Sequence, residues 1–566
     1  MPAPLISIQD LAIDFVTDQQ VTKAVKNISI EVNRGEILAL VGESGSGKSV
    51  TALSILKLLP QPPARYQSGK IIFSEDGYSS LDLLSADQKT IQDIRGNKIA
   101  MIFQEPMTSL NPVMKCGEQV MEAILRHKKL SSIKAKEITI SWFSKVQLPS
   151  PEKIFDRYPH QLSGGQKQRV MIAMAMCCQP SLLICDEPTT ALDVTVQKTI
   201  LGLIKELQKE EDMGVIFITH DLGVVSEIAD RVAIMYKGEI VEQDEVKNIF
   251  TAAKHPYTKA LIACRPAEHE KGQRLPIVAD FISGNQFETS HSENPIIARL
   301  EPSEILVEAK NLVVRFPSTT NLFGRVTSYF TAVNDVSLEV WKGETLGLVG
   351  ESGCGKTTLG RTLLRLIEPD SGSIIYNNRD ITQLEGKELI NLRKEVQLVF
   401  QDPYSSLNPR LTVGAAIAEP MKVTGLIKTS GERKKRVAEL LDRVNLPSHV
   451  ANRYPHEFSG GQRQRIVIAR ALSMNPGFLV CDESVSALDV SVQAQVLNLL
   501  NELKKDLGLT MLFISHDLSV VKYMCDRIMV MQAGSIIESG AAEDVYHRPQ
   551  HHYTKALLEA IPSLRN

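Results

Sequence analysis

The feature that most constrains this 566-residue chain is that its sequence contains the same series of motifs twice. VGESGSGKS at 41–49 returns as VGESGCGKT at 349–357, and RYPHQLSGGQKQRV at 157–170 returns as RYPHEFSGGQRQRI at 453–466. Further pairs keep the same order: IFQEPMTSLNP and VFQDPYSSLNP (102–112, 399–409), ICDEPTTALDV and VCDESVSALDV (184–194, 480–490), FITHDL and FISHDL (217–222, 513–518). One long duplication predicts two similar domains rather than an array of short repeats.

The duplication also suggests where the domains begin and end. A chain of this length exceeds what a single hydrophobic core supports, so at least two domains are required. After the first copy, the regular alternation of apolar and polar runs gives way to a polar stretch containing Pro and Gly. We predict a first domain over residues 1–264, a linker over 265–304 and a second domain over 305–566.

Within each copy, apolar runs rich in β-forming residues alternate with stretches of helical period. In the first copy the apolar runs cover 36–42, 98–104, 181–187, 214–220 and 231–236, and the helical stretches include 49–59 and 194–210. Continuous apolar strands that alternate with helices are typical of a parallel sheet covered on both faces. Each domain is therefore predicted to be α/β with a mostly parallel sheet. VKNISIEV (25–32) and VNDVSLEV (333–340) suggest an added antiparallel β layer.

The composition argues against several other classes of protein. The chain carries 63 Lys and Arg against 66 Asp and Glu, a net charge of −3, which gives no bulk attraction for nucleic acid. No run approaches the roughly 18 to 20 apolar residues of a membrane span, so we expect a cytosolic chain that forms no pore itself. The eight cysteines form no CxxC pair and are predicted to be buried, reduced thiols.

Each copy contains a G-x-x-x-x-G-K-[ST] loop between an apolar strand and a helical stretch. Glycines let successive backbone N–H groups surround a phosphate, and the following helix presents its positive end to the same charge. We expect Lys48 and Lys356 to reach the β and γ phosphates, and Ser49 and Thr357 to ligate Mg²⁺. The predicted nucleotide-binding residues are Gly42, Glu43, Ser44, Gly45, Ser46, Gly47, Lys48 and Ser49, and Gly350, Glu351, Ser352, Gly353, Cys354, Gly355, Lys356 and Thr357.

A pair of carboxylates ends an apolar strand in each copy: Asp186 with Glu187, and Asp482 with Glu483. Sites in parallel sheets are built at such strand ends. The Asp is predicted to hold Mg²⁺, and the Glu to accept a proton from an attacking water. A solvated pair without function is the alternative, but both pairs follow the serine of SGGQ by the same interval.

The SGGQ motifs are the predicted second anion site of each copy. They comprise Ser163, Gly164, Gly165 and Gln166, and Ser459, Gly460, Gly461 and Gln462. A serine before a helical stretch can cap it and leave N–H groups free for a phosphate, although a plain N-cap without ligand has the same letters. Two phosphate sites per copy favour head-to-tail pairing of the copies, with two nucleotides sandwiched between them.

Two more polar residues follow apolar strands in both copies. Gln104 and Gln401 precede segments that Pro and Asn break, and each is predicted to touch Mg²⁺ or the attacking water while the segment behind it moves. His220 and His516 follow the catalytic-glutamate candidates by the same interval. A single His at a strand end is usually a satisfied polar group, but the repeated spacing favours a catalytic role.

In this fixed order, the motifs resemble the ATP-binding cassette (ABC) ATPases twice over, across nearly the whole chain apart from the predicted linker. The SLNP segment, RYPHxxSGGQ and the terminal HPYTKALI (255–262) and HHYTKALL (551–558) resemble the importers of dipeptides, oligopeptides, nickel, glutathione and microcin C. The fused pair is similar to the glutathione and microcin C types. The resemblance implies ATP as substrate, Mg²⁺, a helical signature subdomain in each cassette, and a place at the cytoplasmic face of the membrane.

The resemblance also implies partners: two transmembrane permease subunits and an extracytoplasmic solute-binding protein. It implies an aromatic residue stacked on adenine, for which Phe15 is the candidate in the first copy, whereas Phe316 and Phe330 compete in the second. Relatives often hold an iron-sulfur centre in cysteines after YTKAL, but only Cys264 follows here, so we expect none.

Two other functions would fit part of this pattern. A soluble tandem-cassette ATPase acting on ribosomes or nucleic acid would also lack membrane spans, but neither a long basic arm nor zinc-binding cysteines are visible between the copies. A catalytically inactive pair is disfavoured because both copies keep every motif residue.

Overall fold

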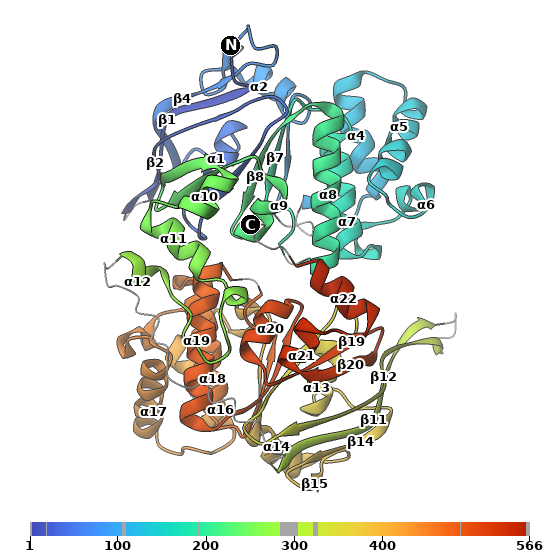
Figure 1. The fold of residues 1–566 in the computed structure, drawn as a ribbon, viewed down its shortest axis with the longest axis vertical. Coiled ribbons are helices and arrows are strands. Elements are labelled where there is room, and N and C mark those ends of the chain that lie inside the picture. The colour runs from blue at the N-terminus through green and yellow to red at the C-terminus, as the bar shows by residue number, and fades with distance from the viewer. Residues whose placement is uncertain are drawn as a thin grey trace. The chain divides into compact units, whose positions relative to one another are not determined.

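The computed structural model describes residues 3–17, 20–104, 109–190, 192–282, 304–320, 326–486 and 488–561. The chain divides into two compact units, each built around one copy of the duplication (Figure 1). The first contains Met1–Leu192 and Val196–Ile262, and the second contains Ala263–Ile561 with Asp193–Thr195. The predicted linker over 265–304 stays a prediction. Its described residues, 265–282 and 304, belong to the second unit.

The first unit is organised around a six-stranded sheet in the order β10-β9-β3-β8-β7-β6. Neighbours from β9 to β6 pair in parallel, and β10 pairs antiparallel with β9. The strands are β3 (Ile37–Val41), β6 (Ile99–Ile102), β7 (Leu182–Asp186), β8 (Gly214–Thr219), β9 (Arg231–Tyr236) and β10 (Glu239–Glu245). Because β3, β7 and β8 are buried along their whole length, their sequences are continuous apolar runs, and the predicted mostly parallel sheet is confirmed.

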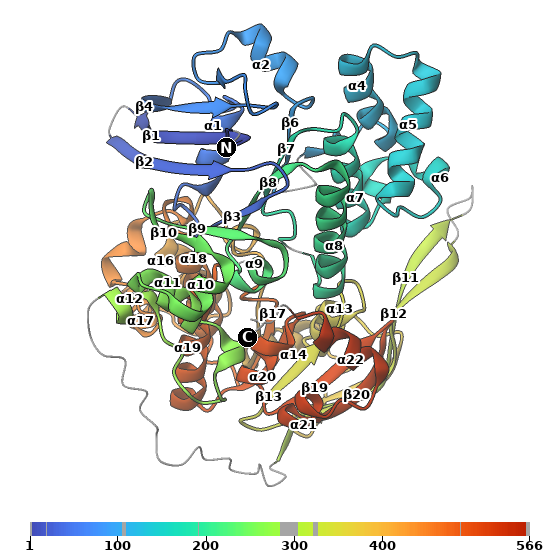
Figure 2. The same cartoon turned by 45° about the horizontal axis from the view of Figure 1, so that its top comes forward.

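The predicted antiparallel layer is present as a second sheet, in the order β2-β1-β4-β5. Its strands are β1 (Ile6–Thr17), β2 (Gln20–Val32), β4 (Ala64–Phe73) and β5 (Leu81–Asp82). Figure 2 shows β1, β2 and β4 side by side. Alternating residues of this sheet share an apolar core with α1 (Lys48–Ile55) and α2 (Gln88–Ile94), so the layer supports the helix that follows the phosphate loop.

The remaining helices of the first unit fall into two sets. A separate helical group, visible in Figure 2, contains α4 (Cys116–Lys128), α5 (Ser132–Lys145), α6 (Pro151–Phe155), the short η1 (Pro159–Gln161) and α7 (Gly164–Met176). Trp142, Phe143 and Phe155 pack in its core. The other set is α8 (Val194–Glu211), α9 (Leu222–Ile228), α10 (Val246–Ala252) and α11 (Pro256–Ala263). The helical group carries the SGGQ motif at the start of α7, which is the subdomain that the ABC resemblance implies.

The second unit repeats this plan, with sheets in the orders β16-β17-β18-β13-β19-β20 and β12-β11-β14-β15. The strands are β11 (Ile305–Thr320), β12 (Val326–Trp341), β13 (Thr345–Val349), β14 (Ser371–Tyr376), β15 (Arg379–Asp380), β16 (Val396–Val399), β17 (Phe478–Asp482), β18 (Thr510–Ser515), β19 (Arg527–Gln532) and β20 (Ser535–Ala541). The helices are α13 (Lys356–Leu363), α14 (Gly386–Glu395), α15 (Pro403–Ser406), α16 (Val413–Val423), α17 (Ser430–Arg443), α18 (Gly460–Leu472), α19 (Val490–Leu507), α20 (Leu518–Met524), α21 (Ala542–His547) and α22 (His552–Glu559). The short helices η3 (Ser448–Asn452) and η4 (Pro455–Glu457) precede α18, and η2 (Pro266–Glu268) and α12 (Val278–Ile282) precede β11.

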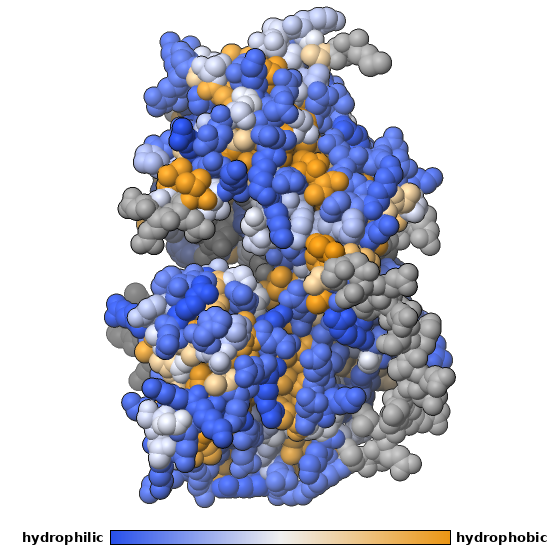
Figure 3. Space-filling view, turned by 90° about the vertical axis from the view of Figure 1, so that its left-hand side faces the viewer, coloured by the Kyte–Doolittle hydropathy of each residue, from blue (hydrophilic) through white to orange (hydrophobic). Residues whose placement is uncertain are grey.

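On the face drawn in Figure 3, hydrophilic side chains predominate over each unit and hydrophobic ones form small scattered groups. Across the ranges that the structure describes, no helix combines the length and apolar character that a bilayer crossing requires.

Candidate nucleotide-binding and catalytic sites

In each unit the phosphate loop runs from the end of a central strand into a helix, from β3 into α1 and from β13 into α13. The last glycine of each loop is left-handed, with φ 107° at Gly47 and 109° at Gly355. A Cβ at these positions would lie 2.6 Å from the Ala24 oxygen and 2.1 Å from the Ala332 oxygen, far inside contact distance. Only glycine fits there, which explains why both loops keep it.

The loop lysines are buried and turned back onto their own loops. Lys48 Nζ donates to the carbonyl oxygens of Gly42 at 2.7 Å and Glu43 at 3.0 Å. Lys356 Nζ makes the same two contacts, to Gly350 and Glu351, at 2.8 Å each. Both ammonium groups therefore lie at the centre of a loop of backbone N–H groups, where a polyphosphate would meet fixed positive charge.

The residue after each lysine faces the carboxylate that ends the neighbouring strand. Ser49 Oγ donates to Asp186 Oδ1 at 3.0 Å, and Thr357 Oγ1 donates to Asp482 Oδ1 at 2.9 Å. Burial raises the pKa of Asp186 to about 6, against the opposing effect of the Ser49 hydrogen bond, and burial also raises the pKa of Asp482. A hydroxyl and a carboxylate side by side are hard oxygen donors, so this pair fits Mg²⁺.

Three other motifs converge on the glutamate beside that carboxylate. In the first unit Gln104 Nε2 donates to Glu187 Oε2 at 3.0 Å, His220 Nδ1 lies 3.3 Å from the same oxygen, and Lys48 Nζ lies 3.9 Å from Oε1. In the second unit the matching distances to Glu483 are 2.6 Å from Gln401, 3.7 Å from His516 and 3.8 Å from Lys356. Residues from three separate parts of the sequence thus meet at one carboxylate in each unit.

These glutamates also share an unusual backbone conformation. Glu187 has φ 47° and Glu483 has φ 46°, a left-handed conformation that non-glycine residues adopt rarely and that is frequent at functional sites. Burial alone would raise the pKa of Glu187, but the hydrogen bond and charge of His220 and the charge of Lys48 outweigh it and lower that pKa to about 2. The carboxylate is therefore ionised and able to accept a proton.

The SGGQ serines are N-caps. Ser163 Oγ accepts from Gln166 N at 3.3 Å while Gln166 Oε1 accepts from Ser163 N at 3.2 Å, and Ser459 with Gln462 repeats this capping box at 3.4 and 3.1 Å. The cap that the sequence allowed is thus present. Both serines are exposed to solvent, so a phosphate could still reach the start of α7 and of α18.

A tyrosine of the YTKAL motif touches each phosphate loop, a contact that the motif analysis did not anticipate. Glu43 N donates to Tyr257 Oη at 3.0 Å, and Glu351 N donates to Tyr553 Oη at 3.1 Å. Tyr257 is fully buried, and its ring packs against Tyr236 with centroids 4.2 Å apart. The phenol oxygen fixes the first turn of the loop.

The rest of the motif fastens the helix that carries this tyrosine. His255 Nδ1 accepts from Tyr257 N at 3.2 Å, and Glu242 of β10 accepts from the backbone of Lys254 and His255 at 2.8 and 3.1 Å. The second unit repeats these contacts with His551 and Glu538. The repeated YTKAL letters indicate that this tyrosine has a role in both cassettes, but the sequence does not reveal which residue the tyrosine contacts.

The adenine-stacking residue stays a prediction in both units. Phe15 lies in β1, half-buried, opposite Thr22 of β2. In the second unit Phe316 of β11 lies directly opposite Phe330 of β12, and both rings are exposed. The two candidates are thus cross-strand neighbours, and either ring could face a base.

With this geometry in view, comparison with known proteins identifies the family. The chain matches the ABC transporter family over residues 25–190 and 333–486, and the family described as oligopeptide/dipeptide transporter, C-terminal region, over 241–289 and 537–566. It is 50% identical over 561 residues to the glutathione import ATP-binding protein GsiA of Pectobacterium atrosepticum, and equally to that of Escherichia coli K12. Each alignment covers 99% of this chain and 89% of the relative. A solved dimer of the ATP-binding cassette MJ0796 matches 42% of the chain at 28% identity, with a TM-score of 0.38.

The chain therefore belongs to the ABC transporter family, as a tandem of two ATP-binding cassettes. Within that family it is the ATP-hydrolysing subunit of an importer of the oligopeptide and dipeptide type. As such a subunit, it works with membrane permease partners.

Proposed function

We propose that the chain drives import of glutathione or a similar short peptide, at the cytoplasmic face of the membrane, by hydrolysing ATP at two sites. Its partners would be two transmembrane permease subunits and an extracytoplasmic solute-binding protein. The glutathione importer subunits that share half of its residues over nearly its whole length support this substrate class. The match to the oligopeptide/dipeptide transporter C-terminal region, which occurs once in each cassette, supports a peptide-like solute.

The catalytic roles in the proposal follow from the contacts around each glutamate. Glu187 and Glu483 would take a proton from the attacking water, because each is an ionised carboxylate at a strand end beside the loop lysine. His220 and His516 would orient the water and the γ phosphate, and Gln104 and Gln401 would report the state of the site to the segments behind them.

Ser49 with Asp186, and Thr357 with Asp482, would hold Mg²⁺ directly or through water, with Gln104 and Gln401 as further oxygen donors. The ion would neutralise charge on the β and γ phosphates. The lysines would exchange their bonds to the loop carbonyls for bonds to phosphate oxygens, at little cost in reorganisation because they already lie inside the loop.

Each complete site would combine the phosphate loop of one cassette with the SGGQ serine of the other, so that Lys48 works with Ser459 and Lys356 with Ser163. This pairing rests on chemistry: each cassette supplies two anion-binding helix starts, at the phosphate loop and at SGGQ, and ATP bound between them would join the cassettes. ATP closes the pair in this scheme, and hydrolysis reopens it.

The segment after the glutamine is the proposed contact with the permease. In the second cassette this segment forms α15, whose exposed Tyr404 is covered on one face by the Arg463 guanidinium at 3.7 Å from the ring. Arg470, on the same helix α18, donates to the Ser406 oxygen at 2.9 Å. A displacement of the SGGQ helix would therefore carry α15 with it, which is the coupling that transport needs.

One observation carries the proposal: lysine, glutamine and histidine motifs converge on one carboxylate in both cassettes. The test is to purify the chain from mild-detergent extracts, identify the membrane subunits that accompany it, and reconstitute the complex in vesicles. We expect ATP-dependent uptake of labelled glutathione or a short peptide, absent when Glu187→Gln and Glu483→Gln are combined. Association with ribosomes or nucleic acid, without membrane subunits, would contradict the proposal.

A further inference from the structure

The residues directly after the first cassette pack as part of the second one. We refer to residues 263–282 as the docking segment. It follows α11 without a spacer, and the boundary between the two units lies between Ile262 and Ala263. Cys264 and Leu275, both fully buried, belong to the apolar core of the second unit. The segment thus continues the chain of one cassette while packing as part of the other.

The backbone of the docking segment is recognised by buried polar side chains of α19 and α20. Leu275 N donates to Asn498 Oδ1 at 2.9 Å, and Asn498 Nδ2 donates to the Leu275 oxygen at 2.8 Å, so one side-chain amide satisfies both groups of one residue. Tyr523 Oη donates to the Gln273 oxygen at 2.6 Å. Because Asn498 and Tyr523 are buried, losing these contacts would remove hydrogen bonds from polar groups in the core.

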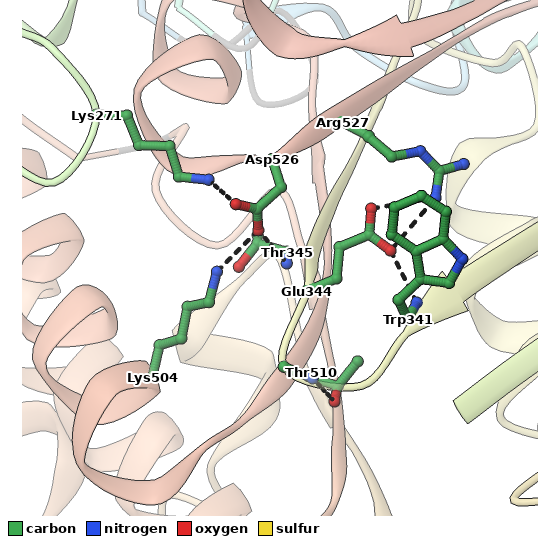
Figure 4. Close-up of polar contacts among 9 residues, drawn as sticks. Lys271, Trp341, Glu344, Thr345, Lys504, Thr510, Asp526 and Arg527 are labelled. Carbon is green, nitrogen blue, oxygen red and sulfur yellow. Dashed lines mark hydrogen bonds and ion pairs between the residues drawn. The ribbon is translucent and has the colours of Figure 1, made fainter. Parts of the chain in front are cut away.

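A buried carboxylate adds a charge contact (Figure 4). Asp526 caps the start of β13 by accepting from Thr345 N at 2.8 Å, and the ammonium groups of Lys271 and Lys504 both point at it. Burial opposes ionisation of Asp526, but the two lysines outweigh burial and lower its pKa. Lys271 belongs to the docking segment and Lys504 to α19, so the carboxylate joins the segment to the cassette.

The first cassette has other residues at the positions that hold the docking segment, so these contacts are specific to the second cassette. In the duplication, Asn498, Lys504 and Tyr523 correspond to Gly202, Gln208 and Glu227, whereas Asp526 corresponds to Asp230. Asp230 keeps the shared capping role, accepting from Ile37 N at 2.9 Å. The residues that hold the docking segment are therefore features of the second cassette alone, and the ABC fold itself does not require them.

We propose that residues 263–282 are a permanent attachment that fastens the first cassette to α19 and α20 of the second, independently of the chain through 283–303. The segments before and after 283–303 both belong to the second unit, so cutting there would not separate the cassettes. The docking segment also continues α11, whose Tyr257 contacts the first phosphate loop. The first nucleotide site is thus linked by one short stretch of chain to the body of the second cassette.

The test is to place the recognition sequence of a site-specific protease between residues 288 and 298 of the full chain and to cut it. The cut chain is then run on size-exclusion chromatography without nucleotide or Mg²⁺, because bound nucleotide could itself hold the cassettes together. We expect the two fragments to elute together at micromolar concentration. Separation of the uncomplexed fragments would overturn the proposal.

Variants identify the contact responsible. Asn498→Gly with Tyr523→Glu installs the first-cassette residues and should weaken association of the cut fragments by on the order of a hundredfold, because several buried polar groups lose their partners. Lys271→Ala, on the partly exposed surface of the segment, should weaken it roughly tenfold without affecting folding of either cassette. The matched control, Glu227→Tyr in the first cassette, should leave association unchanged.

If the fragments of both the double variant and Lys271→Ala associate as tightly as the unmodified fragments, measured as dissociation constants, some other contact holds the fragments and the proposal is wrong. A double variant whose second cassette no longer unfolds cooperatively is judged by Lys271→Ala alone. The readout is independent of activity: fragments that stay together but hydrolyse no ATP would contradict the proposed function and leave the attachment standing.

Discussion

The two cassettes have matching contacts at the nucleotide site. They differ on the surface formed by α8 and α9 in the first cassette and by α19 and α20 in the second. Lys48 and Lys356 each bond to the two corresponding carbonyls of their own loop. Glu187 and Glu483 are surrounded by the same residue types at similar distances. The positions of Asn498 and Tyr523, which hold the docking segment, are occupied by Gly202 and Glu227 in the first cassette. The residues around the phosphate loop are duplicated, whereas the side chains that hold the docking segment differ between the cassettes.

A second difference concerns the SGGQ helices. Arg463 and Arg470 of α18 hold the segment that follows Gln401, one against the Tyr404 ring and one on a backbone oxygen. At the corresponding positions α7 has Lys167 and Met174, which cannot make a planar stack and a charged hydrogen bond. The cassettes thus share the contacts around their phosphate loops and glutamates, and they differ in the residues with which the SGGQ helix faces the segment after the glutamine.

The largest expected effect comes from the catalytic glutamates. Combining Glu187→Gln with Glu483→Gln should lower ATP turnover by at least about a hundredfold, because the amide keeps the shape but accepts no proton. ATP affinity should stay close to that of the unmodified chain. Steady-state hydrolysis and nucleotide titration measure both, with the surface change Glu210→Gln as control. Normal turnover in the double variant would show that these glutamates do not act in catalysis.

The loop lysines test whether the equal sites act together. Lys48→Ala and Lys356→Ala should each reduce hydrolysis by well over half, on the order of tenfold, since one empty site weakens closure of the other. Hydrolysis rates of the two single variants and of the double variant give the comparison. Half of the activity remaining in Lys48→Ala, with transport unchanged, would mean independent sites.

The tyrosines that touch the phosphate loops should have a smaller effect. Tyr257→Phe removes the hydroxyl to which the partly buried Glu43 N–H donates, a hydrogen bond worth about 0.5–1.5 kcal/mol, and should weaken ATP binding roughly five- to tenfold with less change in kcat. Tyr553→Phe should act alike. The control is Tyr236→Phe, which keeps the ring that packs against Tyr257. A lower kcat with unchanged ATP affinity would argue against a positioning role in binding.

The smallest effect is expected from exchanging the hydroxyl residues between the cassettes. Ser49→Thr and Thr357→Ser keep the hydroxyl that faces Asp186 or Asp482, so hydrolysis should change less than about twofold. Ser49→Ala removes that oxygen and should raise the Mg²⁺ concentration required for half-maximal activity. An exchange variant as impaired as Ser49→Ala would show that the two sites differ in shape.

Much of the fold was predictable because its signals are local. Buried strands such as β7 and β17 are continuous apolar runs, and the phosphate loops stand between strand and helix as their motif requires. The docking segment was not predictable, since its polar letters with Pro and Gly are typical of a linker. Its order depends on Asn498, 223 residues away from Leu275. The contact of Tyr257 with Glu43, 214 residues apart, was hidden for the same reason, although its motif was visible.

The central claim, two cassettes of equal chemistry in one chain, is tested most directly by counting trapped nucleotide. The chain carrying Glu187→Gln and Glu483→Gln is incubated with ATP and Mg²⁺, freed of unbound nucleotide, and denatured to measure ATP per chain. The account predicts two ATP per chain, falling sharply when either Lys48→Ala or Lys356→Ala is added. One ATP per chain, unaffected by one of those lysine changes, would contradict it.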